Sequence, residues 1–73
     1  MVTILSVFSE RLKEQRQNSG KKQAEVAALL GVQLRSYQAY EEGAREPNYE
    51  KLILLAKYFQ TSTDYLLGVT DRA

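Results

Sequence analysis

The two residue types that most often supply a general base, a thiolate nucleophile or a zinc ligand, histidine and cysteine, are absent from this sequence. Neither glycine-rich phosphate-binding motif, G-x-x-x-x-G-K or G-x-G-x-x-G, occurs. Glu41 and Glu42 are adjacent, but neighbours on a helix point about 100° apart, a poor arrangement for paired acid–base work. We therefore expect no enzyme activity, no metal site and no cofactor.

The stretch around which the chain is organised is residues 23–41, QAEVAALLGVQLRSYQAYE. This stretch has the pattern of two short helices joined by a tight turn. Five small, apolar or aromatic side chains have the spacing of two inner helical faces: Val26, Ala27, Leu30, Tyr37 and Tyr40. Gly31 follows the first set, and glycine tolerates the left-handed backbone that ends a helix. We expect the first helix to stop at Leu30 and Val32 to turn inward.

Helical signals extend over the rest of the chain. A first helix is expected from Thr3 or Ser6, as N-cap, to about Asn18, and two further helices over 49–59 and from Ser62 to Gly68. The expected core outside residues 23–41 comprises Leu5, Phe8, Leu12, Leu52, Leu55, Ala56, Phe59, Leu66 and Leu67. The four glycines all fall at predicted helix ends, and no alternating strand pattern occurs, so the sequence predicts an all-α fold.

The length and composition predict one small domain. Seventy-three residues without cysteine must rely on a single apolar core. The longest apolar run, residues 52–56, is too short to span a bilayer, and the first residues have neither a basic region nor a cleavage site typical of a secretory signal. We expect a soluble, cytoplasmic protein, with no membrane partner and no evident small-molecule ligand.

The net charge of +1 is uninformative, but its distribution is uneven. Residues 9–22 carry five basic side chains and two acidic ones, whereas residues 46–73 carry three basic and four acidic ones. A nucleic-acid partner, if there is one, is therefore expected at the first half of the chain.

The stretch 23–41 resembles the helix-turn-helix of the lambda-repressor-like family, the phage Cro and repressor (XRE) type. That motif has a small residue at its fifth position and glycine at its ninth, here Ala27 and Gly31. Its five apolar positions are filled by Val26, Leu30, Val32, Tyr37 and Tyr40. The blocks FSERLKEQR, SYQAYEEG and STDYLLG match in order as well. The resemblance implies one five-helix domain over residues 1–73, with the motif at about 22–42 formed by its second and third helices.

The resemblance also implies that residues 33–42 form a recognition helix in the DNA major groove. With Tyr37 and Tyr40 inward, the candidate base contacts are Gln33, Leu34, Arg35, Gln38 and Ala39. Arginine suits guanine, glutamine suits adenine, and leucine or alanine can touch a thymine methyl group. The alternative is that Arg35 and Gln38 belong to an ordinary solvated helix face.

Other residues of the motif are expected at the DNA backbone or inside the fold. The candidate phosphate contacts are Lys21, Lys22, Gln23, Ser36 and Arg45; the alternative for the charged ones is solvated surface charge. In the family a basic residue at the end of the first helix pairs with the Glu after the aromatic residue of the recognition helix. This maps onto Arg16 and Glu41, so the resemblance implies a structural salt bridge there.

The sequence departs from the family pattern at Lys22, where Ser or Thr usually caps the helix. Loss of such a cap costs about 1 kcal/mol, so the second helix is expected either to begin loosely or to become ordered on DNA. Glu42 faces outward near the DNA, where its charge opposes phosphate. Leu54 and Tyr58 point away from the predicted core of the fourth helix, and with the region of Ile4 they could form a homodimer surface.

The expected function is sequence-specific binding of double-stranded DNA by a homodimeric transcriptional regulator, a repressor of phage or prophage type. Two alternatives stay open: an antitoxin or restriction-modification controller, or a protein-interaction module of the same fold.

Overall fold

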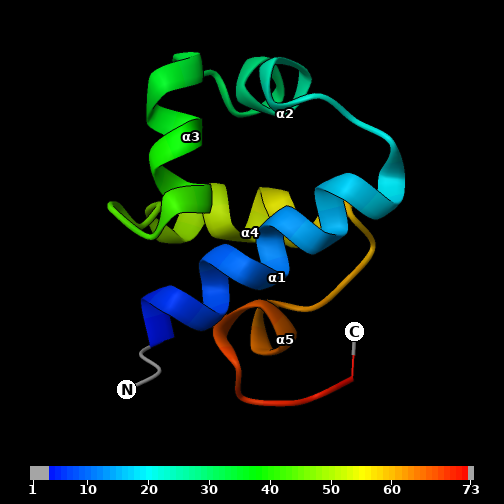
Figure 1. The fold of residues 1–73 in the computed structure, drawn as a ribbon. Coiled ribbons are helices and arrows are strands. Elements are labelled where there is room, and N and C mark those ends of the chain that lie inside the picture. The colour runs from blue at the N-terminus through cyan, green and yellow to red at the C-terminus, as the bar shows by residue number, and fades with distance from the viewer. Residues whose placement is uncertain (1–3, 73) are drawn as a thin grey trace.

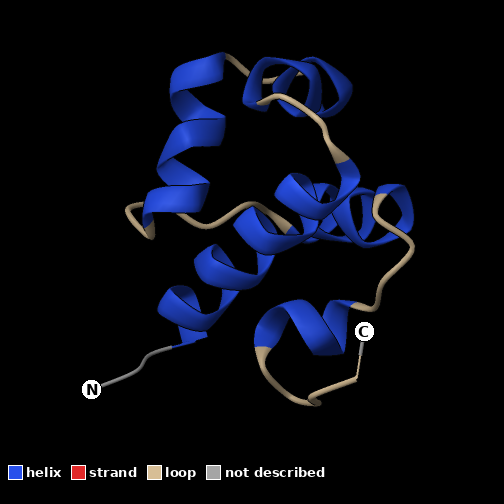
Figure 2. Cartoon of the chain, turned by 45° about the vertical axis from the view of Figure 1, so that its right-hand side comes forward, coloured by secondary structure: helices blue, strands red, loops and turns tan. Residues whose placement is uncertain are grey.

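The computed structural model describes the backbone of residues 4–72 and the side chains of residues 6–72. Five α-helices follow one another along the chain, and the described residues contain no strand (Figures 1 and 2). Their bounds are α1 Ile4–Ser19, α2 Gln23–Leu30, α3 Leu34–Glu42, α4 Tyr49–Tyr58 and α5 Thr63–Leu67. The predicted all-α, five-helix fold is confirmed. None of the described helices is long and apolar enough to cross a membrane.

All five helices contribute to one apolar core. Its buried members are Phe8, Leu12, Val26, Ala27, Leu30, Tyr37, Tyr40, Leu52, Leu55, Ala56 and Leu66. Val32, Phe59 and Leu67, also expected inside, are partly buried and pack against this cluster, while the side chain of Leu5 lies outside the described residues. In Figure 1, α1 and α4 lie below the α2–α3 pair. The shared core therefore holds α2 and α3 against α1 and α4.

The helix ends follow the predicted local signals within about one residue. Asn48 accepts a hydrogen bond from the backbone N–H of Lys51 at 2.9 Å, and Ser62 accepts one from Tyr65 at 3.0 Å, so both are N-caps as expected. The alternative start of α1 at Ser6 is wrong, because the backbone is already helical from Ile4. Thr3, the other predicted cap, lies outside the described residues.

The start of α2 lacks a side-chain cap but is contacted by Glu25. Lys22 occupies the N-cap position in an extended conformation, and its side chain has no oxygen to accept a hydrogen bond. The carboxylate of Glu25, three residues later, accepts a hydrogen bond from the backbone N–H of Lys22 at 3.1 Å. This is one half of a capping box; the other half, a bond from a capping side chain, is missing, so a loosely formed start of α2 stays a prediction.

Arg11 fastens the C-terminal segment to α1. Its guanidinium donates hydrogen bonds to the backbone oxygens of Tyr65 and Thr70, pairs with Asp71 at 3.3 Å, and lies 4.2 Å from the centre of the Tyr65 ring. Gly68, at the end of α5, lies so close to α1 that a Cβ atom there would be 3.0 Å from Val7 Cγ1. Arg11 is therefore an internal clamp rather than a member of a DNA-facing basic patch.

Candidate nucleic-acid interface

The turn between α2 and α3 sets the angle of the two helices. Gly31 adopts a left-handed backbone, with φ 70° and ψ 28°, and the N–H of Val32 donates to the oxygen of Ala27 at 3.0 Å. This bond satisfies a carbonyl that the end of α2 would otherwise leave without a partner. Ala27 is buried at the crossing, where a small side chain allows close approach.

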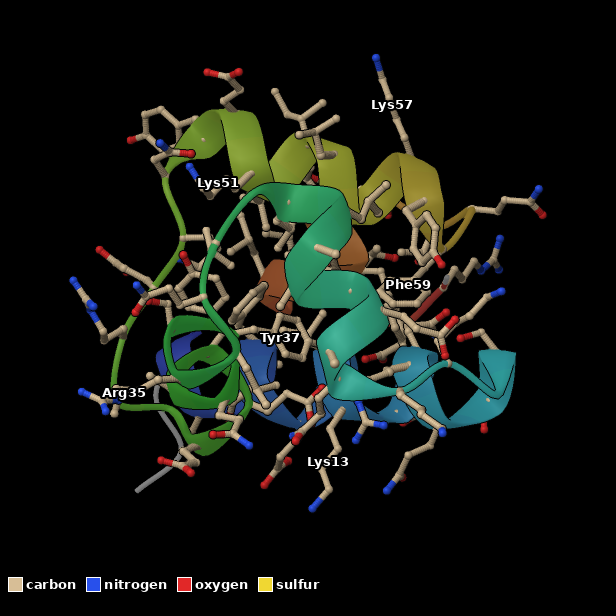
Figure 3. All side chains as sticks on the ribbon, turned by 90° about the horizontal axis from the view of Figure 1, so that it is seen from above. Lys13, Arg35, Tyr37, Lys51, Lys57 and Phe59 are labelled. Carbon is tan, nitrogen blue, oxygen red and sulfur yellow. The ribbon has the colours of Figure 1, made fainter. Side chains whose placement is uncertain are left out.

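Two tyrosines attach α3 to the core. Tyr37 and Tyr40 are buried on the inner face of α3, and their rings meet edge to face with centroids 6.2 Å apart. Because α3 is held along this side, its opposite side is presented outward at the edge of the molecule (Figures 1 and 3).

The residues at the N-terminal tip of α3 are free to meet a partner. Gln33, Leu34 and Arg35 are exposed, and Leu34 leaves 42 % of its surface to solvent despite being apolar. Arg35 points away from the fold (Figure 3) and forms no hydrogen bond or ion pair within residues 6–72. Gln38 and Ala39, one turn further along, are half-buried. The tip of α3 therefore offers a donor, an amide and an apolar side chain together.

Beneath this surface, the carboxylate of Glu41 collects four hydrogen-bond donors. Arg16 donates from Nε to Oε2 at 2.5 Å and from Nη2 to Oε1 at 3.0 Å, so the pair is bidentate. Tyr37 donates its hydroxyl to Oε2, and Gln23 donates Nε2 to Oε1 at 3.1 Å. Arg16 also donates to the backbone oxygen of Lys21 at 3.1 Å. One ion pair thus joins the end of α1, the start of α2 and the end of α3.

The charged state of this ion pair is favoured although it is removed from water. The side chains of Arg16 and Glu41 are only 14 % and 3 % exposed. Burial alone opposes ionisation of Glu41, but the hydrogen bonds from Arg16, Tyr37 and Gln23 outweigh it and hold the pKa of Glu41 below its ordinary value. The hydrogen bond to Glu41 likewise raises the pKa of Arg16. Burial, together with the hydrogen bond to Glu41, raises the pKa of Tyr37, so its hydroxyl stays protonated as a donor.

The side chain of Gln23, which was expected to contact a phosphate, is engaged within the fold. Its side chain is half-buried and donates to Glu41, while its Oε1 accepts a hydrogen bond from Gln38 Nε2 at 3.3 Å. Gln23 is nevertheless the first residue of α2, and the backbone N–H groups of a first helical turn favour anions. The sequence did not predict the contact between Gln23 and Gln38, because it depends on how α2 and α3 cross.

The expected phosphate-binding cations lie at the surface. Lys21, Lys22 and Arg45 are exposed, and Ser36 is half-buried. Two of the five basic residues in residues 9–22, Arg11 and Arg16, are engaged inside the fold. The basic character available to a partner on this stretch is therefore weaker than the sequence count suggested.

Tyr37 also contributes to the Glu41 network. The apolar spacing of α3 predicts only an inward, apolar role for Tyr37, yet its hydroxyl reaches the Glu41 carboxylate. The two residues are four positions apart in a helix, and side chains at that spacing lie on the same face. This spacing was the signal from which the bond could have been inferred.

The crossing of α2 and α3, the glycine turn and the outward tip of α3 together define a helix-turn-helix domain. The profile of the Helix-turn-helix family matches residues 12–66. The chain therefore belongs to the helix-turn-helix family, within its lambda-repressor-like branch.

Several transcriptional regulators are similar to this chain. The HTH-type transcriptional regulator ImmR of Bacillus subtilis (strain 168) is 41 % identical over 61 residues, which are 84 % of this chain and 48 % of ImmR. The cryptic phage CTXphi transcriptional repressor RstR of Vibrio cholerae is also 41 % identical over 61 residues, covering 84 % of this chain and 54 % of RstR.

A solved structure supports the same fold. The crystal structure of a transcriptional regulator from Listeria innocua superposes with a TM-score of 0.81 at 39 % sequence identity, covering 90 % of this chain and 62 % of that chain. In the comparison with the two named regulators, this chain spans about half the length of ImmR and of RstR.

Proposed function

We propose that residues 1–73 act as a single domain that binds double-stranded DNA sequence-specifically and regulates transcription, as a repressor. The observation that carries the proposal is the tip of α3, where Arg35 has no partner within residues 6–72 while the helix beneath it is fixed by Tyr37, Tyr40 and Glu41. A base-reading helix needs that combination of rigid support and unoccupied donors. The relatives named as transcriptional regulators support it. Such a protein binds rather than catalyses, and works in the cytoplasm.

The assigned contacts follow from side-chain chemistry. Arg35 can donate two hydrogen bonds to guanine, Gln33 or Gln38 can pair with adenine, and Leu34 or Ala39 can touch a thymine methyl group. The phosphate contacts come from Lys21, Lys22, Ser36, Arg45 and the first turn of α2, which includes Gln23. These contacts fix the position of the domain, while the tip of α3 reads the bases.

We propose further that two copies bind together, on half-sites about one helical turn apart. The supporting surface lies on α4, where Leu54 is 41 % exposed and Ile53 and Tyr49 are exposed as well. Tyr58, expected at this surface, is half-buried: it packs against the core and meets Phe59 edge to face at 5.0 Å. Of Leu54 and Tyr58, Leu54 is therefore the residue more available to a second copy. The side chain of Ile4, also expected at this surface, lies outside the described residues.

Selection of bound sites from a random DNA pool, followed by salt titration, tests the proposal. A recovered two-fold symmetric site supports both specific binding and the dimer. Affinity for that site should fall steeply as salt rises from about 50 to 200 mM. Binding releases counterions from the DNA phosphates, and this release is less favourable at higher salt. Recovery of no sequence preference would contradict the proposed function.

The alternative with a specific observation behind it is a protein-interaction module. Glu42 is exposed on α3, where its charge repels phosphate, and only part of the predicted basic patch is free. Such a module would show no salt-dependent binding to DNA. An antitoxin or a restriction-modification controller would instead bind DNA through the same face, and the genes beside it would distinguish these roles.

A further inference from the structure

A chain of hydrogen bonds connects the buried ion pair to a candidate base contact. Gln38 Nε2 donates to Gln23 Oε1 at 3.3 Å, and Gln23 Nε2 donates to Glu41 Oε1 at 3.1 Å. Glu41 is itself held by Arg16. Gln23 and Gln38 are half-buried, so the chain runs from the interior of the fold to the outer side of α3.

The direction of every bond in this chain is dictated by Glu41. An ionised carboxylate only accepts hydrogen bonds and has about four acceptor sites. Arg16, Tyr37 and Gln23 fill them with four donor contacts. Gln23 must therefore turn its NH₂ group toward Glu41, which places its oxygen on the side of Gln38, where it accepts from Gln38 Nε2. Gln38 must in turn offer its NH₂ group to Gln23.

This arrangement leaves Gln38 with one donor and one acceptor for a partner. A glutamine amide carries two N–H hydrogens and one oxygen. One hydrogen is occupied by Gln23, and Oε1 of Gln38 has no partner within the described residues. If Gln23 were turned the other way, its NH₂ group would face Gln38, whose oxygen would be occupied and both of whose hydrogens would be free.

Adenine and guanine differ in what they require from such an amide. In the major groove adenine presents the N7 acceptor and the N6 amino donor, so it is matched by one N–H and one oxygen. Guanine presents two acceptors, N7 and O6, and is matched by two donors. The free groups of Gln38 therefore fit adenine and leave one guanine acceptor facing an oxygen.

We infer that Gln23 is a positioning residue for specificity: anchored by Glu41, it fixes the amide of Gln38 so that Gln38 selects adenine over guanine. The inference rests on the proposed function, since it assumes that Gln38 faces a base. Gln23 thereby acts on specificity through Gln38, in addition to any contact of its own with the DNA backbone.

The first test needs no DNA. In nuclear magnetic resonance spectra of the free protein, the side-chain amide hydrogens of Gln23 and Gln38 should exchange with water more slowly than those of Gln17, which is exposed on α1 and serves as an internal control. In Gln23→Met the protection of Gln38 should disappear. Equal exchange of Gln38 in the parent and in Gln23→Met would overturn the inference, whatever the protein binds.

The second test measures base preference on duplexes recovered by selection. The position read by Gln38 is the one where Gln38→Ala relaxes the preference. At that position the parent should favour adenine over guanine by about 5- to 150-fold, the range of a good bidentate pair. Gln23→Met should reduce this ratio to within about twofold of Gln38→Ala, and Gln23→Met/Gln38→Ala should reduce it no further.

Gln23→Lys is the companion variant, because lysine can still donate to Glu41 but offers no acceptor to Gln38. It should lose the adenine preference as Gln23→Met does, and it keeps the test available if Gln23→Met fails to fold. A uniform loss of affinity cancels in the ratio, so a lost phosphate contact does not imitate the result.

The outcomes separate the two proposals. No sequence preference in the parent would defeat the proposed function and this inference with it. A parent that prefers one sequence, with no position relaxed by Gln38→Ala, would overturn the inference alone. So would an adenine preference that both Gln23 variants retain.

Discussion

At the scale of single residues, the Arg16–Glu41 pair shows why a buried charge can be both costly and necessary. Each ion loses hydration on burial, and only complete hydrogen bonding offsets that loss. Here the Glu41 carboxylate has all its acceptor sites filled from three different helices. Removing one partner leaves the other charge buried without compensation, which is why single substitutions at this pair are informative.

Glu41→Gln should destabilise the fold by about 3 kcal/mol or more, because Arg16 then keeps a buried charge without its counter-ion. Urea denaturation measures the change in the free energy of unfolding. Glu42→Gln is the matched control: the neighbouring carboxylate is exposed, and its neutralisation should change stability by no more than about 0.5 kcal/mol. If the two variants unfold alike, Glu41 does not carry the role assigned to it.

The same carboxylate predicts how stability depends on pH. Because its pKa is lower in the folded state than in the unfolded chain, where it is about 4.3, the stabilisation is fully present above about pH 5 and is lost as the pH falls through the folded-state value. The parent should therefore lose stability faster than Glu41→Gln between about pH 5 and pH 2. Unfolding curves of both proteins across this range provide the measurement, and a constant difference between them would refute the linkage.

At the scale of elements, the helices were predictable because their signals are local. The apolar spacing, the caps Asn48 and Ser62 and the glycines at helix ends each depend on a few neighbouring residues. The Arg11 clamp was not predictable in this way, because it requires residues about 60 positions apart to meet. The bond between Gln23 and Gln38 was hidden for a similar reason. The Arg16–Glu41 pair was expected only through the family resemblance, since no pattern within the chain links residues 25 positions apart.

Gly31 is the element-scale position whose substitution is easiest to interpret. A Cβ atom added there would lie within 4 Å of no atom outside the two neighbouring residues, so the cost of Gly31→Ala comes from the left-handed backbone at φ 70°. That conformation costs about 1–2 kcal/mol for a residue with a Cβ atom. Thermal or urea unfolding should show a loss of this size.

Gly31→Asn is the control, because asparagine enters the left-handed region more readily. It should be less destabilising than Gly31→Ala. Equal losses for the two variants would mean that the backbone conformation of Gly31 is not what limits substitution at the turn.

At the scale of the whole molecule, the faces have separate tasks. The tip of α3 is turned toward the proposed DNA, and α5 and the Arg11 clamp close the core beneath α1 (Figure 1). The exposed apolar residues of α4 form the proposed surface for a second copy. A two-fold DNA site would require two copies to act together, so dimerisation and specific binding are linked in the proposal.

Leu54→Glu tests the proposed dimer surface. Leu54 is exposed on α4, so the charge should leave the monomer folded while weakening association. Sedimentation of the parent and the variant at equal concentration should show a lower mass for the variant. Lys57→Glu is the charge control, because Lys57 is exposed on α4 as Leu54 is. Ser62 is unsuitable as a control, because it caps α5. A mass unchanged by Leu54→Glu would eliminate this surface.

The most direct test of the central claim compares Arg35→Ala with the parent on the selected DNA site and on random duplex. If Arg35 reads a base, the variant should lose about 1–3 kcal/mol on the selected site, with relaxed preference at one position, and much less on random DNA. Lys22→Ala should weaken both duplexes alike, as expected of a phosphate contact. Equal losses for Arg35→Ala on the selected and the random duplex would contradict the claim that the tip of α3 reads sequence.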